Sequence, residues 1–231
     1  MGAHFNAAAI KFLKGLEKNN DREWFGARKE IYERELKAPM LEVVGEINHA
    51  MLDFAPDFVR EPAKCVMRIY RDIRFSKNKK PYKTHVSAWW ARQGMEKTSG
   101  GGYYVEMSST VVTIAAGVYM PEKEQLLAIR RMLVERHEEY RSILASRKMK
   151  SLGIAPFDGL KMARGPKGFD AAGPAGELIL QQQWGVSTHL PVETALDAGF
   201  VKTVVARLKA CAPLVDLLNE PLIPKARKPM F

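Results

Sequence analysis

A run of residues with two-residue periodicity, from about residue 64 to residue 119, most constrains what this chain can fold into. Apolar and polar side chains alternate at 65–70 and again at 103–108, segment 84–91 is rich in Val, Ser and Trp, and 111–119 follows almost at once. Alternation of this kind is typical of strands that bury one face. The connections between these segments carry no helical pattern, so we expect an antiparallel meander of about four strands.

Helical patterns precede this sheet region. Asn6 is placed to cap a first helix, Asn20 followed by Glu23 resembles a capping box for a second, and Pro39 fits the first turn of a third. Apolar residues recur at helical spacing within each of these segments. We therefore expect residues 1–55 to be helical.

Helices are also expected after the sheet. Pro121 opens a segment whose apolar residues lie on one face of a helix, and short helices are predicted near Glu177–Gln183 and within Val192–Leu218. Residues 150–176 are rich in Gly and Pro and read as loop. The sequence therefore predicts a single α+β domain over residues 1–231, with the sheet at 63–120 and helices over 121–220.

Composition narrows the class of protein. With 231 residues and 46% hydrophobic content, the chain is able to bury a full core. Its longest apolar run, Val111–Met120, is too short to cross a bilayer, and the N-terminus lacks the pattern of a secretory signal. Cys65 and Cys211 sit in apolar stretches far apart, which predicts buried free thiols in a reducing compartment. We expect a cytoplasmic protein with no membrane contact.

Positive charge is concentrated in one segment. Between Arg60 and Arg92 there are ten Lys or Arg residues and only two acidic ones, Glu61 and Asp72, in a chain whose net charge is +10. A basic balance confined to one segment suggests a phosphorylated or polyanionic partner. The alternative is a solvated surface that is basic for solubility.

The same segment carries a resemblance to a known family. Residues 68–85 read RIYRDIRFSKNKKPYKTH. Further stretches with a family pattern are 12–25, 102–106, 117–122 and 165–170, so the likeness covers nearly the whole chain. In this combination the sequence resembles the family catalogued as domain of unknown function 2461, whose members share an RDxRFSxDKxPYK-like loop.

The resemblance implies an α+β fold and an intracellular location. It supplies no established reaction, so no catalytic residue is carried over to this chain. Two departures from the pattern are visible. Asn78 stands where the family usually has Asp, and Ala172-Gly173 stands where an Asp-His pair often precedes Pro174.

Several side chains of the basic segment are suited to hold an anion. The arginines offer planar forks that match carboxylate or phosphate, and the lysines add point charges. Phe75 and Tyr82 interrupt the charges, and either is suited to pin the loop to the core. The alternative is that Asp72 and two of the arginines form a structural ion-pair network. The candidate ligand residues in this segment are Arg71, Arg74, Ser76, Lys79 and Lys83.

Strand alternation places a second group of polar residues together. Tyr104 and Glu106 share one strand face, and Arg68 and His85 lie on the same surface if the strand faces coincide. Titratable groups in mid-strand need partners or a ligand, so Glu106 and His85 are weak candidates for a general base. The alternative is a cross-strand ion pair between Arg68 and Glu106.

A third candidate is the loop around Arg164 and Lys167, whose glycines allow backbone donors to approach an anion. The alternative is an ordinary basic surface loop. The sequence lacks GxxxxGK[ST], GxGxxG, GxSxG and HExxH, and its five histidines lack ligand spacing. We therefore expect no cofactor and no metal.

Three functions remain in competition. The first is binding of a small phosphorylated or carboxylated ligand, with or without catalysis. The second is a nucleic-acid-binding module, in which basic residues contact phosphates and aromatic residues stack on bases. The third is docking of an acidic protein partner on the basic segment. The sequence leaves open the identity of the ligand, the presence of catalysis and the oligomeric state. The aromatic residues that suit stacking are Tyr70, Phe75, Tyr82, Trp89 and Trp90.

Overall fold

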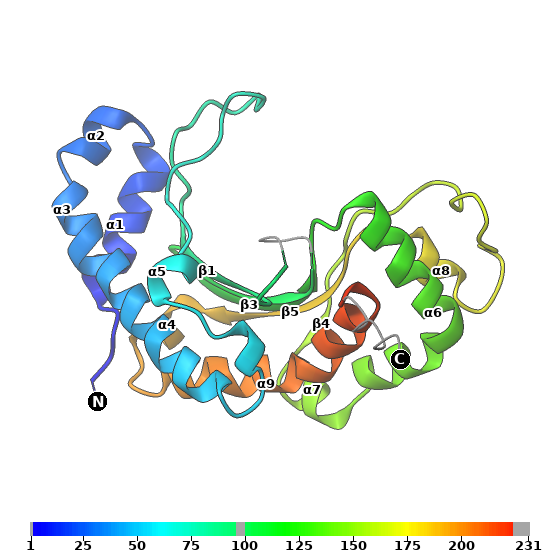
Figure 1. The fold of residues 1–231 in the computed structure, drawn as a ribbon. Coiled ribbons are helices and arrows are strands. Elements are labelled where there is room, and N and C mark those ends of the chain that lie inside the picture. Colours follow the sequence, from blue (N-terminus) through cyan, green and yellow to red (C-terminus); the bar gives the residue numbers. More distant parts are fainter. Residues whose placement is uncertain (1, 96–99, 224–231) are drawn as a thin grey trace, which may run out of the picture. The chain divides into compact units, whose positions relative to one another are not determined.

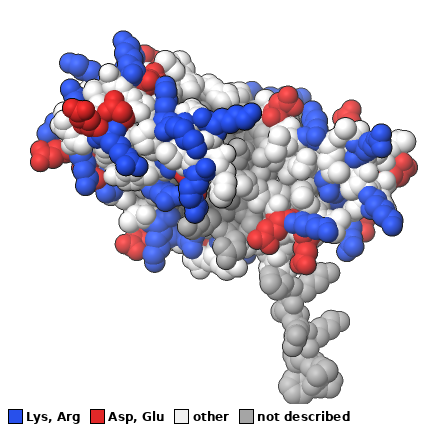
Figure 2. All heavy atoms as spheres, turned by 90° about the horizontal axis from the view of Figure 1, so that it is seen from above, with Lys and Arg blue, Asp and Glu red and all other residues white. Residues whose placement is uncertain are grey.

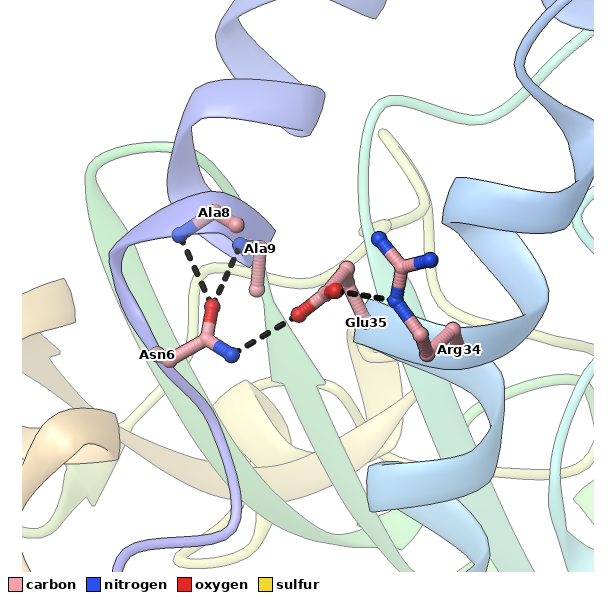
Figure 3. Close-up of polar contacts among 5 residues, drawn as sticks. All are labelled: Asn6, Ala8, Ala9, Arg34 and Glu35. Carbon is pink, nitrogen blue, oxygen red and sulfur yellow. Dashed lines mark hydrogen bonds and ion pairs between the residues drawn. The ribbon is translucent and has the colours of Figure 1, made fainter.

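The first helix begins where the sequence predicts it. In the computed structural model, which describes residues 2–95 and 100–223, helix α1 (Ala7–Lys18) is capped by Asn6. The Asn6 Oδ1 accepts hydrogen bonds from the amides of Ala8 at 2.8 Å and Ala9 at 3.3 Å (Figure 3). This arrangement satisfies amide groups that a helix start otherwise leaves without partners.

The same side chain joins α1 to a π-helical turn, η1 (Glu33–Lys37). Asn6 Nδ2 donates to Oε2 of Glu35 at 2.7 Å, while Arg34 Nε donates to its Oε1 at 2.6 Å (Figure 3). The hydrogen bond from Arg34, and then that from Asn6, lowers the pKa of Glu35. The start of α1 therefore holds the middle of η1 in place.

The second helix is capped by a different residue from the one predicted. Asp21, not Asn20, caps α2 (Arg22–Gly26), because its Oδ1 accepts from the Trp24 amide at 2.8 Å. The capping-box prediction for Asn20 and Glu23 is therefore wrong by one residue. Either Asn or Asp serves as an N-cap, so sequence preference alone does not separate two such neighbours.

The remaining N-terminal helices pack through apolar faces. Helix α4 (Ala38–Met51) carries Pro39 in its first turn, as predicted, and buries Met40, Val44 and Ile47. Helical spacing of these residues explains why one face of α4 is fully enclosed. The other short helices before the sheet are α3 (Lys29–Tyr32), η2 (Pro56–Phe58) and α5 (Pro62–Cys65).

The predicted α+β fold is confirmed: within the described ranges an antiparallel sheet of five strands is flanked by helices on both sides in the sequence (Figure 1). The strand order is β1-β2-β3-β5-β4, so the first three strands correspond to three of the about four strands of the predicted meander. At its edge, Ala155 of β4 pairs with Ser187 of β5. The strands are β1 (Val86–Ala91), β2 (Gly102–Met107), β3 (Val111–Val118), β4 (Ala155–Pro156) and β5 (Trp184–Pro191).

The segment 65–70 is not the continuous strand that alternation predicts. Pro62 opens the short helix α5, which takes in Cys65, and beyond it only Val66 and Tyr70 form isolated antiparallel bridges. Pro at a first helical position is pre-organised for a helical turn, which shortens the stretch available for pairing. The alternation in 65–70 therefore reports burial on one side of an extended segment.

The sequence patterns did not predict strand β5, because they indicate only helices on either side of it. Its neighbour β3 approaches closely at Gly117, whose φ is +134°. A Cβ at Gly117 would lie 2.2 Å from the Trp184 carbonyl oxygen of β5. Glycine is therefore required at this position, where the two paired strands approach each other closely.

The C-terminal helices include the longest of the chain. Helix α6 (Lys123–Leu144) begins at Glu122 in a capping box, with the Glu122 amide donating to Gln125 Oε1 at 2.8 Å. Its buried Arg130 donates to the backbone carbonyls of Ile179 at 2.8 Å and Gln181 at 3.0 Å, which compensates the burial of that charge. The other elements are α7 (Arg147–Ser151), α8 (Gly176–Leu180), η3 (Val192–Leu196), α9 (Phe200–Asn219) and η4 (Glu220–Leu222).

The described residues form two compact units. The first runs as far as Trp90 and adds Tyr103–Ala115 and Thr188–Lys209. The second takes in the described parts of Ala91–Gly102, Ala116–Ser187 and the segment from Ala210 onwards. Each unit has its own apolar core, and the prediction of a single domain stays a prediction.

The two cysteines are free and buried, as predicted. Burial raises the pKa of the Cys65 thiol to about 11 and that of the Cys211 thiol to about 12. Thiols with such values remain protonated at neutral pH and are poor nucleophiles. Separately, no helix among residues 2–95 and 100–223 is both long and apolar enough to cross a lipid bilayer.

Candidate functional site

The basic segment folds into an arm, defined here as residues 70–82, that extends away from the sheet (Figure 1). Its two sides pair in antiparallel fashion at Tyr70 and Tyr82. The Arg71 amide donates to the Pro81 carbonyl at 2.9 Å, next to this bridge. The base of the arm is therefore a short two-stranded ladder. Figure 2 shows Lys and Arg side chains spread over the face of the molecule from which the arm rises.

Tyr82 anchors the arm to the first unit. Its side chain is buried, and its ring stacks on Phe25 with centroids 4.1 Å apart. Asn20 holds the same residue, because its Oδ1 accepts from the Tyr82 amide and its Nδ2 donates to the Tyr82 carbonyl, both at 3.0 Å. Of the two aromatic residues expected to pin the arm, Tyr82 does so, whereas Phe75 is 95% exposed.

Three cations of the arm, Arg71, Arg74 and Lys79, contact other groups of the arm. Arg74 forms a bidentate pair with Asp72, at 3.0 Å from Nε to Oδ1 and 2.8 Å from Nη2 to Oδ2. Arg71 Nη1 donates to the Lys80 carbonyl at 2.9 Å, and Lys79 Nζ donates to the Ile73 carbonyl at 3.1 Å. These are the contacts of a structural network that shapes a loop.

The Arg74–Asp72 pair also fixes the charge on the carboxylate. Hydrogen bonds from the Arg74 side chain, and then from its backbone, hold the pKa of Asp72 at about 2. The carboxylate is ionised at neutral pH and balances one guanidinium. Ser76 is the remaining predicted ligand residue of the arm, and its Oγ lies 3.5 Å from Arg71 Nη2. The arm thus brings Arg71, Arg74, Ser76 and Lys79 together around its own backbone.

A second group of predicted residues gathers on one face of β2. Tyr104 and Glu106 are half-buried on this face, whereas Tyr103 and Val105 are fully buried on the other. The predicted alternation along this strand is confirmed. We call the polar group on this face the sheet-face cluster, and its members are Arg68, Lys83, His85, Tyr104 and Glu106.

The centre of the sheet-face cluster is the Glu106 carboxylate. The Tyr104 hydroxyl donates to Glu106 Oε2 at 2.5 Å, and His85 Nε2 lies 3.5 Å from the same oxygen. The side chains of His85 and Glu106 are 25% and 21% exposed, so water reaches both only in part. A carboxylate, an imidazole and a phenol are thus placed within reach of one another, as acid–base chemistry requires.

Lys83 interacts electrostatically with both Glu106 and Arg68. The Lys83 Nζ and the Arg68 guanidinium have no hydrogen-bond or ion-pair partner within 4.0 Å among the described residues. Burial, and then the positive charge of Arg68, lowers the pKa of Lys83, while Glu106 acts in the opposite direction. A half-buried ammonium group without a direct partner carries a free-energy cost that an anionic ligand would offset.

Burial favours the neutral form of the His85 imidazole. Burial is the main cause that lowers its pKa below 6.5, Lys83 lowers it further, and Glu106 opposes both. A neutral imidazole has one nitrogen free to accept a proton. This neutral form of His85 is therefore the protonation state of a general base.

The comparison with protein families decides what kind of chain this is. The family model described as Conserved hypothetical protein (DUF2461) matches residues 8–217. The chain belongs to this family. No curated protein and no solved structure matches it.

In this DUF2461 chain, the two departures from the family pattern lie in turns. The Asn78 Oδ1 accepts from the Lys80 amide at 3.0 Å, a contact that Asp would make equally well. The Ala172 amide donates to Asp170 Oδ1 at 2.9 Å. Asn78 therefore preserves the shape of the arm while removing one negative charge from it.

The third candidate loop of the DUF2461 chain belongs to the second unit. Arg164 and Lys167 are exposed there, in a stretch between Lys161, which bridges to Gln181, and α8. Anion binding by this loop stays a prediction. In the part of the chain that the structure describes, no group of three or more His, Cys, Asp or Glu side chains is arranged to hold a metal ion.

Sequence reasoning missed the role of Asn20, which it assigned to a helix cap. The amide side chain instead pairs with both backbone groups of Tyr82, 62 positions away. Asn offers a donor and an acceptor at once, and this is the property that such a contact uses. A pattern within one segment carries no signal for a partner so distant in the sequence.

Proposed function

We propose that this protein binds a small phosphorylated or carboxylated ligand at the sheet-face cluster. The observation that carries the proposal is the pair of cations, Lys83 and Arg68, whose side chains have no hydrogen-bond partner among the described residues. Lys83 interacts electrostatically with both Arg68 and Glu106. Lysine and arginine together suit an anion with several acceptor oxygens. Arg71, Arg74 and Lys79 are poorer candidates for ligand binding than Lys83 and Arg68, because they already contact other groups of the arm.

The neighbouring groups suit proton transfer to or from such a ligand. Burial favours the neutral form of His85, which lies 3.5 Å from Glu106 Oε2, and Tyr104 donates to the same oxygen. The carboxylate holds the imidazole beside it, and the imidazole accepts a proton from the bound ligand. We therefore infer that His85 is the base and that Glu106 orients it, as carboxylates do for histidines in acid–base sites.

Isothermal titration calorimetry with inorganic phosphate and with malonate tests the binding site. We expect Lys83→Ala and Arg68→Ala each to weaken binding by about tenfold, the usual size of a lost charge-assisted hydrogen bond. The matched control is Lys77→Ala, which removes an exposed lysine of the arm and should leave the affinity unchanged. Thermal melts establish that each variant remains folded.

A variant of the arm separates this proposal from anion binding on the arm itself. Arg71→Ala combined with Arg74→Ala removes both forks there but leaves the sheet-face cluster intact. We expect this double variant to bind phosphate as the parent does. Loss of binding in the arm variant, with binding retained in Lys83→Ala, would show that the proposed location is wrong.

A second candidate function is contact with single-stranded nucleic acid, and the exposure of Phe75 favours it. This ring is 95% exposed, and the Arg74 guanidinium lies 5.8 Å from its centroid. A free aromatic face among cations is what stacking on a base and contact with phosphates require. This candidate predicts an affinity that falls as salt rises.

A further inference from the structure

A cleft of about 270 Å³ lies beside the N-terminal helices of the first unit. It shares only Arg68 with the sheet-face cluster. Most of its wall is aromatic or aliphatic, and a single six-membered ring with a short substituent suits this volume. The apolar side chains that matter here are Phe25, Tyr32, Leu41, Val66, Met67 and Tyr70.

The charges around this cleft do not cancel. Lys37 Nζ donates to Glu33 Oε2 at 2.7 Å, so this acid and this base neutralise each other within the wall. The other two charged residues of the lining are Lys29 and Arg68, and neither side chain has a hydrogen-bond or ion-pair partner within 4.0 Å among the described residues. The lining of the cleft therefore combines two cations that lack ion-pair partners with mainly apolar side chains.

The wall that carries Glu33 and Lys37 is the π-helical turn η1. Its Glu35 is held by Asn6 and Arg34 (Figure 3), so the turn is fixed from the side of α1 while Glu33 and Lys37 line the cleft. π-Helical turns are rare and recur at functional sites. This turn is a second feature, independent of the charges, that marks the cleft.

The phenol of Tyr32 adds no charge to the cleft. Burial, and then the negative charge of Glu33, raises its pKa to about 12. The hydroxyl is therefore neutral at any physiological pH and remains available as a hydrogen-bond donor. An anion entering the cleft meets two cations and a neutral donor, and the lone carboxylate in the lining is already paired.

We propose that this cleft binds a small aromatic carboxylate, with one ring and one acidic group. The ring would lie among Phe25, Tyr32 and Tyr70, whose own rings already pack edge-on or tilted against one another. The carboxylate would lie between Lys29 and Arg68. A single carboxylate offers acceptor oxygens to both cations, and the apolar lining disfavours ligands that are polar throughout.

Ligand-observed NMR and calorimetry with phenylacetate test the proposal, and phenylacetamide is the uncharged probe of matched shape. We expect phenylacetate to bind and phenylacetamide to bind about tenfold more weakly or not at all, because the amide lacks the charge that Lys29 and Arg68 attract. Lys29→Ala should weaken phenylacetate binding by a similar factor. Lys14→Ala, which removes an exposed lysine outside the cleft, should have no effect.

A variant that fills the cleft tests its location. We expect Leu41→Trp to abolish phenylacetate binding while phosphate binding at the sheet-face cluster persists. Lys83→Ala should instead weaken phosphate binding and leave phenylacetate binding unchanged. Lys29 is exposed, so Lys29→Ala keeps the test informative if Leu41→Trp fails to fold. Equal affinity for the two probes, or phenylacetate binding that survives both Lys29→Ala and Leu41→Trp, would overturn the proposal.

Discussion

At His85, burial and a neighbouring carboxylate act on one imidazole in opposite directions. Burial lowers its pKa, Lys83 lowers it further, and Glu106 raises it, with the balance on the side of lowering. Because the pKa in the folded state lies below 6.5, the unfolded chain takes up this proton first as the pH falls. The shifted pKa of His85 therefore leaves the free energy of unfolding unchanged above about pH 6.5. Below that pH the free energy of unfolding falls, until the pH reaches the pKa of His85 in the folded state.

The variant His85→Gln tests this linkage. Glutamine keeps a polar side chain beside Glu106 but does not titrate, so the variant should lose part of the fall in melting temperature between about pH 7 and pH 5. Thermal melts of parent and variant over this range make the measurement. Parallel curves for the two proteins would show that His85 carries no shifted proton equilibrium. The control is His49→Gln, which replaces an exposed histidine.

Among the elements, the pairing of β3 with β5 depends on one backbone position. Gly117 combines a φ of +134° with close approach of the Trp184 carbonyl and of the Gly185 Cα. Any side chain there meets both backbone strain and a steric clash with main-chain atoms that cannot move independently. The contact is therefore a sensitive probe of this pair of strands.

Substitution of this glycine should be costly. We expect Gly117→Ala to lower the free energy of unfolding by about 3 kcal/mol or more, through strain and clash together. The matched control is Gly168→Ala, where φ is +87° but no atom lies within 4 Å of the added Cβ. Strain alone should cost about 1 kcal/mol at that position. Urea unfolding followed by circular dichroism measures both, and equal losses would contradict the role given to the clash.

Sequence patterns predicted the elements whose signals are local. The cap at Asn6, the proline at the start of α4 and the three strands of the meander follow from residues close together in the chain. The π-helical turn η1 and the strand β5 do not, because each depends on partners far away: Asn6 for η1, and β3 for β5. Segment 65–70 shows the converse, since its alternation is genuine but its pairing is interrupted after Pro62.

For the candidate site too, the sequence predicted only the features that depend on a local pattern. Alternation along β2 placed Tyr104 and Glu106 on one face, and His85 does meet Glu106 there. The contacts of the arm were not predictable, because Lys79 and Arg71 donate to backbone carbonyls whose positions depend on the path of the loop. Sequence shows which side chains carry charge, whereas only the folded path shows which of them are already paired.

For the molecule as a whole, the distribution of charge matters more than its total. The net charge is +10, and the segment between Arg60 and Arg92 holds ten of the 36 basic residues with only two acidic ones. Asp72 neutralises Arg74 within the arm, but Lys77 and Lys80 are exposed and their ammonium groups form no hydrogen bond or ion pair with the described residues. A polyanion would therefore meet the arm first.

An electrophoretic mobility shift with single-stranded DNA, repeated over a range of salt concentrations, tests this expectation. Each lost phosphate contact on a single strand lowers the slope of log affinity against log salt by about 0.7, so Lys77→Glu with Lys80→Glu should lower it by about 1.4. Phe75→Ala should instead weaken binding by about 1–3 kcal/mol at every salt concentration, because stacking is not screened.

The matched control is Lys148→Glu with Lys150→Glu, which makes the same change of charge on α7. If this control lowers affinity as much as the arm variant does, only the net charge of the chain matters. An absence of binding at low salt would remove nucleic acid as a ligand of the arm.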